Sequence, residues 1–366
     1  EALGPELVAR IDAAVVQAAR GSAIRDVKAS YTNIALMSAF LMAEAGALEP
    51  DSGLREKGVA KARAIYEGFR EHRTFSEYNS PTYYGVDLRV LALWRSLAES
   101  PELSSWGLEM ERELWRDIGQ FYHAGLRTMC GPHVRAYGMD MMRYTALTGL
   151  AIAMVLDDPD LAPIPGSEVY RRSGEWTSLT LHAVLGFRVP ADVVADLRSF
   201  SGPRQVRRTV ARGKRTYQVD AVLRENWMMG TIDGLGGTWE QHFIATAHWR
   251  APDGSTQWLL INGASGVHTT LEDGSVVVSL PAKREPDRPL RLFIDPDGVE
   301  MDQLSGTRLL LPGFEFKVRG LLGKPTISPV ELPRMGEVIE LLWQVPKSVP
   351  EDQPIMILNP IPTNSR

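Results

Sequence analysis

Three side chains that together suit proton transfer on an acidic substrate follow the helix-breaking pair Gly131-Pro132. If the loop after this pair is extended, alternate side chains point the same way. We therefore expect His133, Arg135 and Tyr137 to line one side of an exposed loop. An imidazole that can lose a proton, a guanidinium that holds a carboxylate through two parallel bonds and a phenol together suit proton transfer on an acidic substrate.

Each of these side chains also has a structural alternative. Backbone groups can satisfy His133, and Tyr137 can pack into the core. Arg135 can pair with a nearby carboxylate such as Asp140. The combination of all three on one turn between helices keeps the catalytic interpretation open beside the structural one.

A second motif, residues 77–88, is dense in polar and aromatic groups and runs directly into an apolar helix. Ser80 or Thr82 is a suitable N-cap, and Pro81 suits the entry to a helix. Capping does not explain the other polar side chains of the motif, Tyr78, Asn79, Tyr83 and Tyr84. We therefore expect part of this motif to be functional.

Carboxylates offer a different chemistry. Glycoside hydrolysis needs two carboxyl groups that face one cleft. Glu77, Asp87 and Asp140 are the candidates, with Glu77 and Asp140 as the favoured pair. Because the sequence does not give the distance between them, this alternative stays open.

The elements that must position these residues are helical up to about residue 200. Apolar residues recur at helical spacing, for example at Leu7, Ile11 and Val15. Helices are predicted over the stretches 7–16, 34–41, 54–70, 82–98, 103–128 and 138–156. Short connections imply antiparallel helical hairpins stacked side by side. Residues 157–180 predict a long loop, with a short helix near 179–185.

After residue 200 the apolar period changes to two, as in Tyr217, Val219 and Ala221, which is typical of half-buried strands. The predicted strands are 217–224, 242–249, 257–261, 275–280, 290–294, 308–311, 314–318 and 338–343. Turns of the hairpin type are expected at Asp253-Gly254, Asp273-Gly274 and Asp297-Gly298. Many short strands with turn signals between them indicate an antiparallel sandwich.

Together the two patterns predict an α+β chain of two domains, a helical domain over residues 1–200 and an antiparallel β-sandwich over residues 201–366. The length of 366 residues suits two domains of roughly 150 residues or more each. The proline-rich segment from Pro346 is expected to form an extended strap.

Composition excludes several classes of protein. Apolar residues make up 44% and charged residues 23%, which are ordinary values for a globular chain with a real core. The 40 Lys and Arg against 45 Asp and Glu give a net charge of −5, which does not suggest a nucleic-acid partner. Cys130 is the single cysteine, so it forms no internal disulfide and is expected to be buried. No apolar run approaches the ~20 residues that a membrane span needs.

Two further patterns lie in or near the β half. Seven basic residues between 204 and 224 form either a solvated face or, with Arg171 and Arg172, a rim that attracts anions. His242 and His248 are six apart in an alternating strand, so we expect them on one face. Two histidines can begin a metal site, but a third ligand is not evident, and we expect no metal.

The NSPTYYG motif at residues 79–85, the H-x-R-x-Y-G-M-D-M loop and an ENWMMG strand at residues 225–230 follow one another along the chain. In these motifs and in its layout the chain resembles the polysaccharide lyases built from an (α/α) toroid and an antiparallel β-sandwich. These are the chondroitin AC lyase, alginate lyase and heparinase II/III-like enzymes. The resemblance covers most of the chain in layout and is specific only in the two short motifs. Because the chain is short for the group, we expect an incomplete toroid, and it lacks the Asn-His pair of the alginate-lyase kind.

The resemblance implies a carbon–oxygen lyase that cleaves a uronic-acid-containing glycan by β-elimination in a cleft between the two halves. In such lyases an Asn, often with an Arg, neutralises the uronate carboxylate. A His or Tyr removes the C5 proton, and a Tyr donates a proton to the leaving oxygen. Asn79, His133 and Tyr137 occur in that order, with Arg135 beside them. A tyrosine base needs a nearby cation to lower its pKa from ~10, and Arg135 is the candidate.

Further residues are expected to bind substrate, namely Tyr83, Tyr84, Arg171, Arg172, Trp176, Gln241, His242 and His248. No metal or organic cofactor is expected, and the expected partner is an acidic poly- or oligosaccharide, with neither nucleic acid nor membrane. Because the sequence starts at Glu1 without a methionine, we expect that a leader or N-terminal segment has been removed. A secreted or periplasmic location is expected, with a cytoplasmic one left open. The alternatives are an (α/α)-barrel hydrolase that uses Glu77 and Asp140, and a non-catalytic glycan-binding protein.

Overall fold

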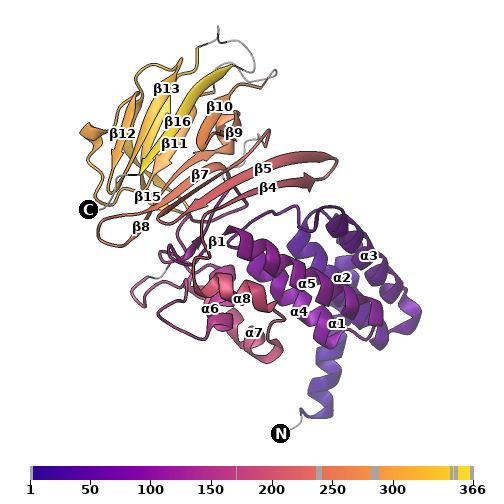
Figure 1. Cartoon of the computed structure of the whole chain (residues 1–366). Helices are drawn as coiled ribbons and strands as arrows, with labels where there is room; N and C mark the ends of the chain where they lie inside the picture. The colour runs from indigo at the N-terminus through magenta and orange to yellow at the C-terminus, as the bar shows by residue number, and fades with distance from the viewer. Residues whose placement is uncertain are drawn as a thin grey trace.

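The computed structural model of the chain describes residues 3–169, 171–235, 241–281, 288–346, 349 and 353–362. A helical part and a β part lie end to end, with the N-terminus at the far end of the helical part (Figure 1). The change from helix to strand falls between Arg198 and Arg204. The α+β fold class predicted from the sequence is confirmed.

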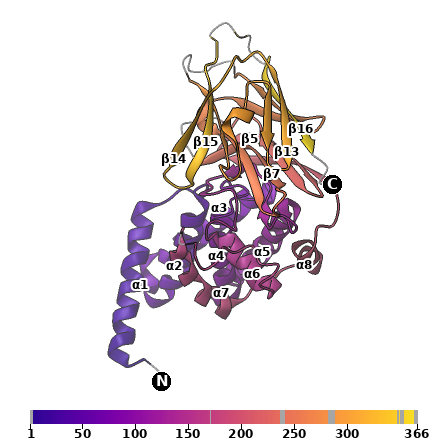
Figure 2. The same cartoon turned by 90° about the vertical axis from the view of Figure 1, so that its left-hand side faces the viewer.

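The helical part is built from hairpins whose helices pack side by side. Its helices are α1 (Pro5–Arg25), α2 (Thr32–Leu48), α3 (Leu54–His72), α4 (Tyr83–Leu97), α5 (Pro101–Phe121), α6 (Leu147–Leu156), α7 (Leu179–Leu185) and α8 (Ala191–Arg198), with the short 3-10 helices η1 (Pro50–Ser52) and η2 (Ser173–Ser178). Helix α2 packs against α1, α3 and α4. Helix α1 extends beyond the other helices, away from the β part (Figure 2). No helix in the described ranges is long and apolar enough to cross a membrane.

Two of the predicted helices differ from the structure. The helix predicted over 103–128 ends at Phe121 and gives way to a small hairpin of β1 (Tyr122–His123) and β2 (Thr128–Met129). The helix predicted over 138–156 begins only at Leu147. Before it, the Asp140 carboxylate accepts a hydrogen bond from the Met142 backbone N–H at 2.8 Å. This side-chain bond competes with helix formation and holds the segment as a loop.

The β part consists of two antiparallel sheets. The larger sheet has the order β14-β15-β11-β8-β7-β6-β5-β4, with β3 added to β7. Its strands are β3 (His133–Val134), β4 (Arg204–Arg212), β5 (Arg215–Arg224), β6 (Trp227–Ile232), β7 (His242–Arg250), β8 (Thr256–Asn262), β11 (Leu290–Ile294), β14 (Thr326–Leu332) and β15 (Gly336–Trp343). Because β3 comes from the loop between β2 and α6, this sheet binds the helical half of the chain directly.

The smaller sheet has the order β12-β13-β16-β10-β9. Its strands are β9 (His268–Glu272), β10 (Ser275–Ser279), β12 (Arg308–Leu311), β13 (Phe314–Gly320) and β16 (Pro354–Pro362), and the 3-10 helices η3 (Gly263–Ser265) and η4 (Met301–Gln303) lie in the loops. Trp249 of the larger sheet stacks on Phe314 of the smaller one, with ring centroids 5.4 Å apart. The two sheets thus form the predicted sandwich.

The basic segment 204–212 forms strand β4, which was not among the predicted strands, and its Arg207 is exposed. Two predictions for the β half need correction. Within the segment expected to be a strap, residues 354–362 form strand β16, which pairs with both β10 and β13. Asp297-Gly298 joins no hairpin, because β11 lies in the larger sheet and β12 in the smaller. Asp253-Gly254 and Asp273-Gly274 do turn between paired strands.

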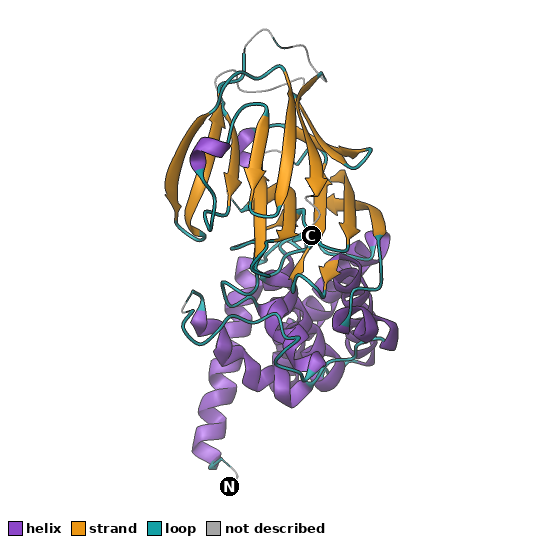
Figure 3. Cartoon of the chain, turned by 60° about the vertical axis from the view of Figure 1, so that its left-hand side comes forward, coloured by secondary structure: helices purple, strands orange, loops and turns teal. Residues whose placement is uncertain are grey.

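One apolar core runs from the helices into the sandwich. Val134 in the connecting loop is buried in it, and its N–H donates to the Tyr78 carbonyl at 3.0 Å. The connecting loop and the larger sheet approach each other closely at Gly230 of β6, where an added Cβ would lie 1.8 Å from the Gly131 carbonyl oxygen. Only glycine fits there. Loops gather where the helical and β parts meet (Figure 3), and Arg135 and Tyr137 lie on one of them.

Candidate active site

Cavities with walls from both halves of the chain lie at this junction. A cavity of about 360 Å³ has Tyr31, Glu77, Arg135 and Arg212 in its wall. A smaller one of about 110 Å³ is lined by Gln241, Phe243, Arg334 and Met335, among others. A third, of about 260 Å³, is described below. The cleft predicted between the two halves therefore corresponds to several separate hollows around the loop that carries β3.

Tyr137 and Arg135 converge with a residue of the other motif, Tyr83. The Tyr83 hydroxyl hydrogen-bonds the Tyr137 hydroxyl. Arg135 donates from Nη2 to the same Tyr83 oxygen at 2.7 Å, and its guanidinium carbon lies 4.0 Å from the centre of the Tyr83 ring. Tyr83 thus accepts a bond from Arg135 and has its own proton available for the bond to Tyr137. The two motifs, more than 50 residues apart, thus meet in one cluster, here called the tyrosine cluster: Tyr83, Arg135 and Tyr137.

The surroundings of Tyr137 favour its ionised form. Burial alone would raise the pKa of this half-buried phenol. Hydrogen bonds from Tyr83 and Gln241 and the charges of Arg135 and Arg172 outweigh burial, so the pKa of Tyr137 is lowered. Burial and the hydrogen bond to Tyr137 raise the pKa of Tyr83. Two phenols whose pKa values are driven apart are suited to acid and base roles.

Further cations surround the tyrosine cluster. The guanidinium carbons of Arg172 and Arg334 lie 4.3 and 5.0 Å from the centre of the Tyr137 ring. Arg135 forms an ion pair with Glu77 and lies 5.0 Å from the centre of the Tyr31 ring. Arg171 and Arg172 belong to the long loop predicted over 157–180, whereas Arg334 lies in the β14–β15 turn, which no sequence pattern singled out.

Asn79 and His133 are placed differently from the prediction of an exposed loop. Both side chains are 0% exposed. Asn79 Nδ2 donates to the carbonyl oxygens of Cys130 and Pro132, at 2.7 and 2.9 Å. His133 Nδ1 lies 2.9 Å from the Asn79 carbonyl, and burial lowers the pKa of His133 to about 4. In this structure both residues hold the loop in shape, and neither is in the wall of the three cavities described above.

The predicted alternation fails at Arg135. This residue has a positive φ of 63°, so the chain leaves the extended conformation there. His133 lies in strand β3 and faces Phe243 and His248, with ring centroids 6.3 and 6.4 Å away. Arg135 and Tyr137 instead turn toward Tyr83. One left-handed residue thus separates a buried histidine from an accessible tyrosine.

The prediction that His242 and His248 share a face is wrong. A β-bulge between Phe243 and Ala245 shifts the register of β7 and reverses the alternation. His248 Nε2 bonds to the Met139 carbonyl at 3.0 Å, while His242 Nε2 lies 2.8 Å from Arg212 Nη1 on the opposite face. In the described ranges no group of three or more His, Cys, Asp or Glu side chains is arranged to hold a metal.

Other expected binding residues are scattered. Tyr84 is 0% exposed and donates to Asp117 at 2.8 Å in the helical core, so it does not reach the cluster. Trp176 lies half-exposed on η2 and is absent from the walls of these cavities. Gln241 lies beside Tyr137, as described, and Arg171 donates to the Met335 carbonyl. Of the eight, Tyr83, Arg172 and Gln241 lie at Tyr137.

The basic segment of β4 ties the two halves together. Arg208 forms an ion pair with the buried Asp117 and donates to the His72 carbonyl at 2.9 Å. Arg204 donates to the Tyr122 carbonyl at 2.6 Å. These arginines are occupied in structural contacts, and only Arg212 of this strand lines a cavity of the junction.

The hydrolase pair is not brought to one cleft. Glu77 lines the 360 Å³ cavity and Asp140 the 260 Å³ cavity. Asp87 is fully buried in helix α4, and burial raises its pKa well above the usual value. The geometry thus gives no support to Glu77 and Asp140 as an acid and base acting on one bond.

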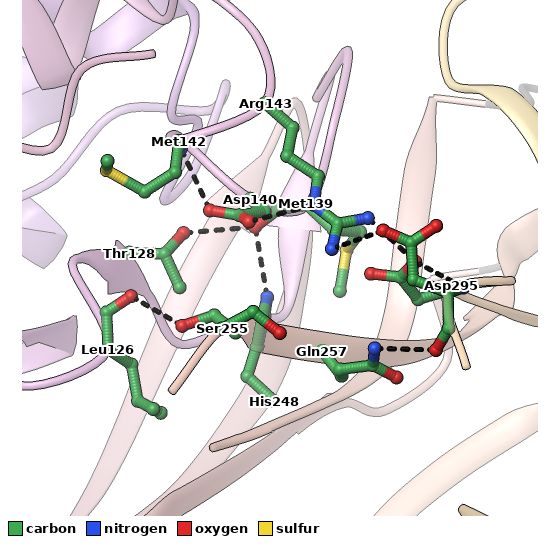
Figure 4. Close-up of polar contacts among 12 residues, drawn as sticks. Leu126, Thr128, Met139, Asp140, Met142, Arg143, His248, Ser255, Gln257 and Asp295 are labelled. Carbon is green, nitrogen blue, oxygen red and sulfur yellow. Dashed lines mark hydrogen bonds and ion pairs between the residues drawn. The ribbon is translucent and has the colours of Figure 1, made fainter. Parts of the chain in front are cut away.

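Asp140 instead belongs to a group of charges that the sequence did not reveal. Arg143 lies between Asp140 and Asp295 (Figure 4), with its Nη1 2.8 Å from Asp295 Oδ1 and its Nε 3.5 Å from Asp140 Oδ2. Burial raises the pKa of Asp140 to about 7 and that of Asp295 to about 6, against the opposing charge of Arg143. Such buried carboxylates near a cavity often mark function.

We expect Asp140→Asn to stabilise the protein more at high pH than at low pH. The folded-state pKa of about 7 is above the unfolded value of 3.8, so the contribution of Asp140 to stability is lost as the pH rises through 7. Asparagine keeps the acceptor for the Met142 N–H but never ionises. The gain in unfolding free energy should grow by about 2–3 kcal/mol between pH 5 and pH 8, measured by urea denaturation. The exposed Asp302→Asn is the control, and a gain independent of pH would contradict the assignment.

The fold and the junction define an α+β protein with a cluster of tyrosines and arginines between a helical half and a β-sandwich. The chain belongs to the family described as domain of unknown function DUF8769, whose model matches residues 1–186. No curated protein matches the sequence. The crystal structure of heparinase III is similar over 91% of this chain and 62% of its own, with 10% identity and a TM-score of 0.34. The chain thus spans less than two thirds of that structure, and no function follows from so distant a likeness.

Proposed function

We propose that this protein is a lyase that cleaves a uronic-acid-containing glycan by β-elimination, with Tyr137 as the residue that transfers the proton. The observation that carries the proposal is the half-buried Tyr137 phenol. Its pKa is lowered, and two guanidinium groups lie within 5.0 Å of its ring centre. The substrate would enter from the hollows around the loop that carries β3.

The charges around Tyr137 suit a carboxylate ligand. The guanidinium groups of Arg172 and Arg334 lie over the Tyr137 ring, and Arg135 donates to Tyr83, the partner of Tyr137. Glu77 and Glu175 form ion pairs with Arg135 and Arg172. A proton next to a carboxylate is scarcely acidic until the carboxylate charge is neutralised. Arginine also suits this role because its fork matches both carboxylate oxygens. Guanidinium groups placed around Tyr137 would stabilise the enediolate that forms in the transition state.

The elimination balances with the groups present. The Tyr137 phenolate takes the C5 proton, and the electrons of the C–H bond form the C4–C5 double bond. The C4–O bond breaks, and the departing oxygen takes the proton back from Tyr137. Tyr83, bonded to Tyr137 and Arg135, would hold the phenol in place and share its charge. Asn79 and His133 support the loop in this proposal, so the carboxylate-binding role inferred for Asn79 passes to the arginines.

The test is an assay of the purified protein with alginate, polygalacturonate, hyaluronan and chondroitin. We expect at least one to yield unsaturated uronate ends, detected by their ultraviolet absorbance and by mass spectrometry. New reducing ends without unsaturation would indicate a hydrolase instead. Binding of these glycans without any cleavage would indicate a non-catalytic glycan-binding protein, and either result would overturn the proposal.

A further inference from the structure

The outer face of the smaller sheet carries a row of polar side chains. The strand register places Arg308 of β12 opposite Lys317 of β13, and Lys317 opposite Asn359 of β16. Asn359 Oδ1 accepts a hydrogen bond from Ser275 Oγ of β10 at 2.9 Å, and Ser275 lies opposite Glu272 of β9. Because residues that lie opposite each other in antiparallel strands point to the same face, these five form one line across the sheet. We call them the polar row.

The polar row faces away from the larger sheet and is separate from the tyrosine cluster. Phe316 and Val318, the neighbours of Lys317 in β13, are buried in the core, so Lys317 points outward. Adjacent strands lie about 4.8 Å apart, so the row is about 19 Å long. An open hollow of about 650 Å³ lies at its β12–β13 end, with Arg308, Lys317 and Arg319 in its wall. None of the residues in this wall lines the three cavities of the junction.

The β12–β13 end of the polar row is positively charged. Arg308 is paired with Glu315, to which it donates from Nε at 3.0 Å and from Nη2 at 2.8 Å. Lys317 and Arg319 are exposed, and neither forms an ion pair with another residue in the described ranges. These two cations therefore attract an anionic ligand to this end of the row.

The fold itself does not explain this charge. Lys317 lies directly opposite Arg308, and like charges that face each other across two strands are destabilising. Glu315 compensates Arg308 but leaves Lys317 and Arg319 on the same face of β13. Natural chains keep locally unfavourable choices of this kind mainly at functional sites. A ligand therefore accounts for the charge better than stability does.

We propose that the polar row binds an acidic polysaccharide at a place apart from the tyrosine cluster. Lys317 and Arg319 receive its anionic groups, and sugar hydroxyls donate to the exposed Glu272 carboxylate at the other end. Ile361, in the wall of the hollow, supplies apolar surface for a sugar ring. A nucleic acid fits less well, because Glu272 repels phosphate and no aromatic side chain among the described residues of the wall can stack on a base. The inference holds with or without lyase activity.

The test is affinity electrophoresis of the full chain in gels that contain polygalacturonate, hyaluronan or heparin, with neutral dextran and single-stranded DNA in parallel gels. All variants carry Tyr137→Phe, so that the polymer is not cut during the run. We expect at least one acidic polysaccharide to retard the protein and dextran to have no effect. Lys317→Glu combined with Arg319→Glu should weaken that binding about tenfold, since two exposed ion pairs with the polymer are lost.

Two controls separate binding from net charge and from misfolding. Arg10→Glu combined with Arg112→Glu makes the same change of net charge at exposed positions of α1 and α5, and should bind as the parent does. Lys317→Glu alone places a carboxylate opposite Arg308, so this variant should unfold at the same temperature as the parent or higher while binding more weakly.

Several outcomes would overturn the inference. These are no retardation by any acidic polysaccharide, equal retardation by dextran, tighter binding of the DNA, an equal loss in the control pair, and unchanged binding of the variant with both Lys317→Glu and Arg319→Glu. Binding that depends on Lys317 and Arg319, in a protein that shows no lyase activity before Tyr137→Phe is introduced, would contradict the proposed function and support the inference. Lyase activity without such binding would do the reverse.

Discussion

Tyr137→Phe is expected to lower the turnover of a uronate glycan by about 10²–10⁴-fold, the usual contribution of a general acid or base. The change removes the oxygen that Tyr83 and Gln241 stabilise and that the arginines help to ionise. The ring remains, so its contacts with Arg172 and Arg334 persist. Because Tyr137 is half-buried, we expect little change in melting temperature.

The measurement is a comparison of kcat and KM between the protein and Tyr137→Phe. A fall in kcat with a nearly constant KM is expected, because the phenol acts on the proton and the arginines hold the carboxylate. Tyr66→Phe is the matched control, since Tyr66 hydrogen-bonds Glu109 on the outer helices. If Tyr137→Phe retained full activity, another residue would have to transfer the proton, and the assignment would fail.

Asn79→Ala is expected to lower the free energy of unfolding by about 3 kcal/mol. The change deletes two buried hydrogen bonds, to the carbonyl oxygens of Cys130 and Pro132, each of about 1 kcal/mol. It also places alanine at a φ of 49°, a left-handed conformation that asparagine tolerates and alanine adopts at a cost of about 1 kcal/mol. Denaturant unfolding followed by circular dichroism measures the loss.

Asn79→Gly separates the two causes. Glycine accepts the left-handed conformation, so this variant should recover about 1 kcal/mol of the loss while still lacking the hydrogen bonds. A substrate-binding asparagine would behave differently, with a fall in kcat and no change in stability. Full stability of Asn79→Ala would therefore contradict the role that the structure gives to this side chain.

The helices and strands were predictable where their apolar periods are regular. The period of 3.6 found α3 and α4, and the period of two found β5 and β7. The helical period gave wrong helix bounds after Phe121, because the loop that carries β3 is largely buried, as the core face of a helix would be. Strand β4 was missed because its apolar alternation is interrupted by arginines, two of which, Arg204 and Arg208, donate to carbonyl oxygens of the helical half.

Part of the candidate site could be predicted from the sequence, again where the signal is local. Local motifs brought Arg135, Tyr137 and Tyr83 to notice, and long-range folding brought them together. Sequence spacing could not show that Arg135 takes a left-handed conformation, which turns His133 away. It also could not show that Arg334 reaches Tyr137 from the β14–β15 turn, or that Asp295 lies near Asp140, since those contacts join segments more than 150 residues apart.

The place of β16 has a consequence for how the chain reaches its folded state. This strand lies between β10 and β13, so neither of these strands has its full set of partners until residues 354–362 arrive. During synthesis both therefore present open backbone edges, which invite pairing with other chains. The helical half is synthesised first and its helices pack on one another, whereas the smaller sheet closes last.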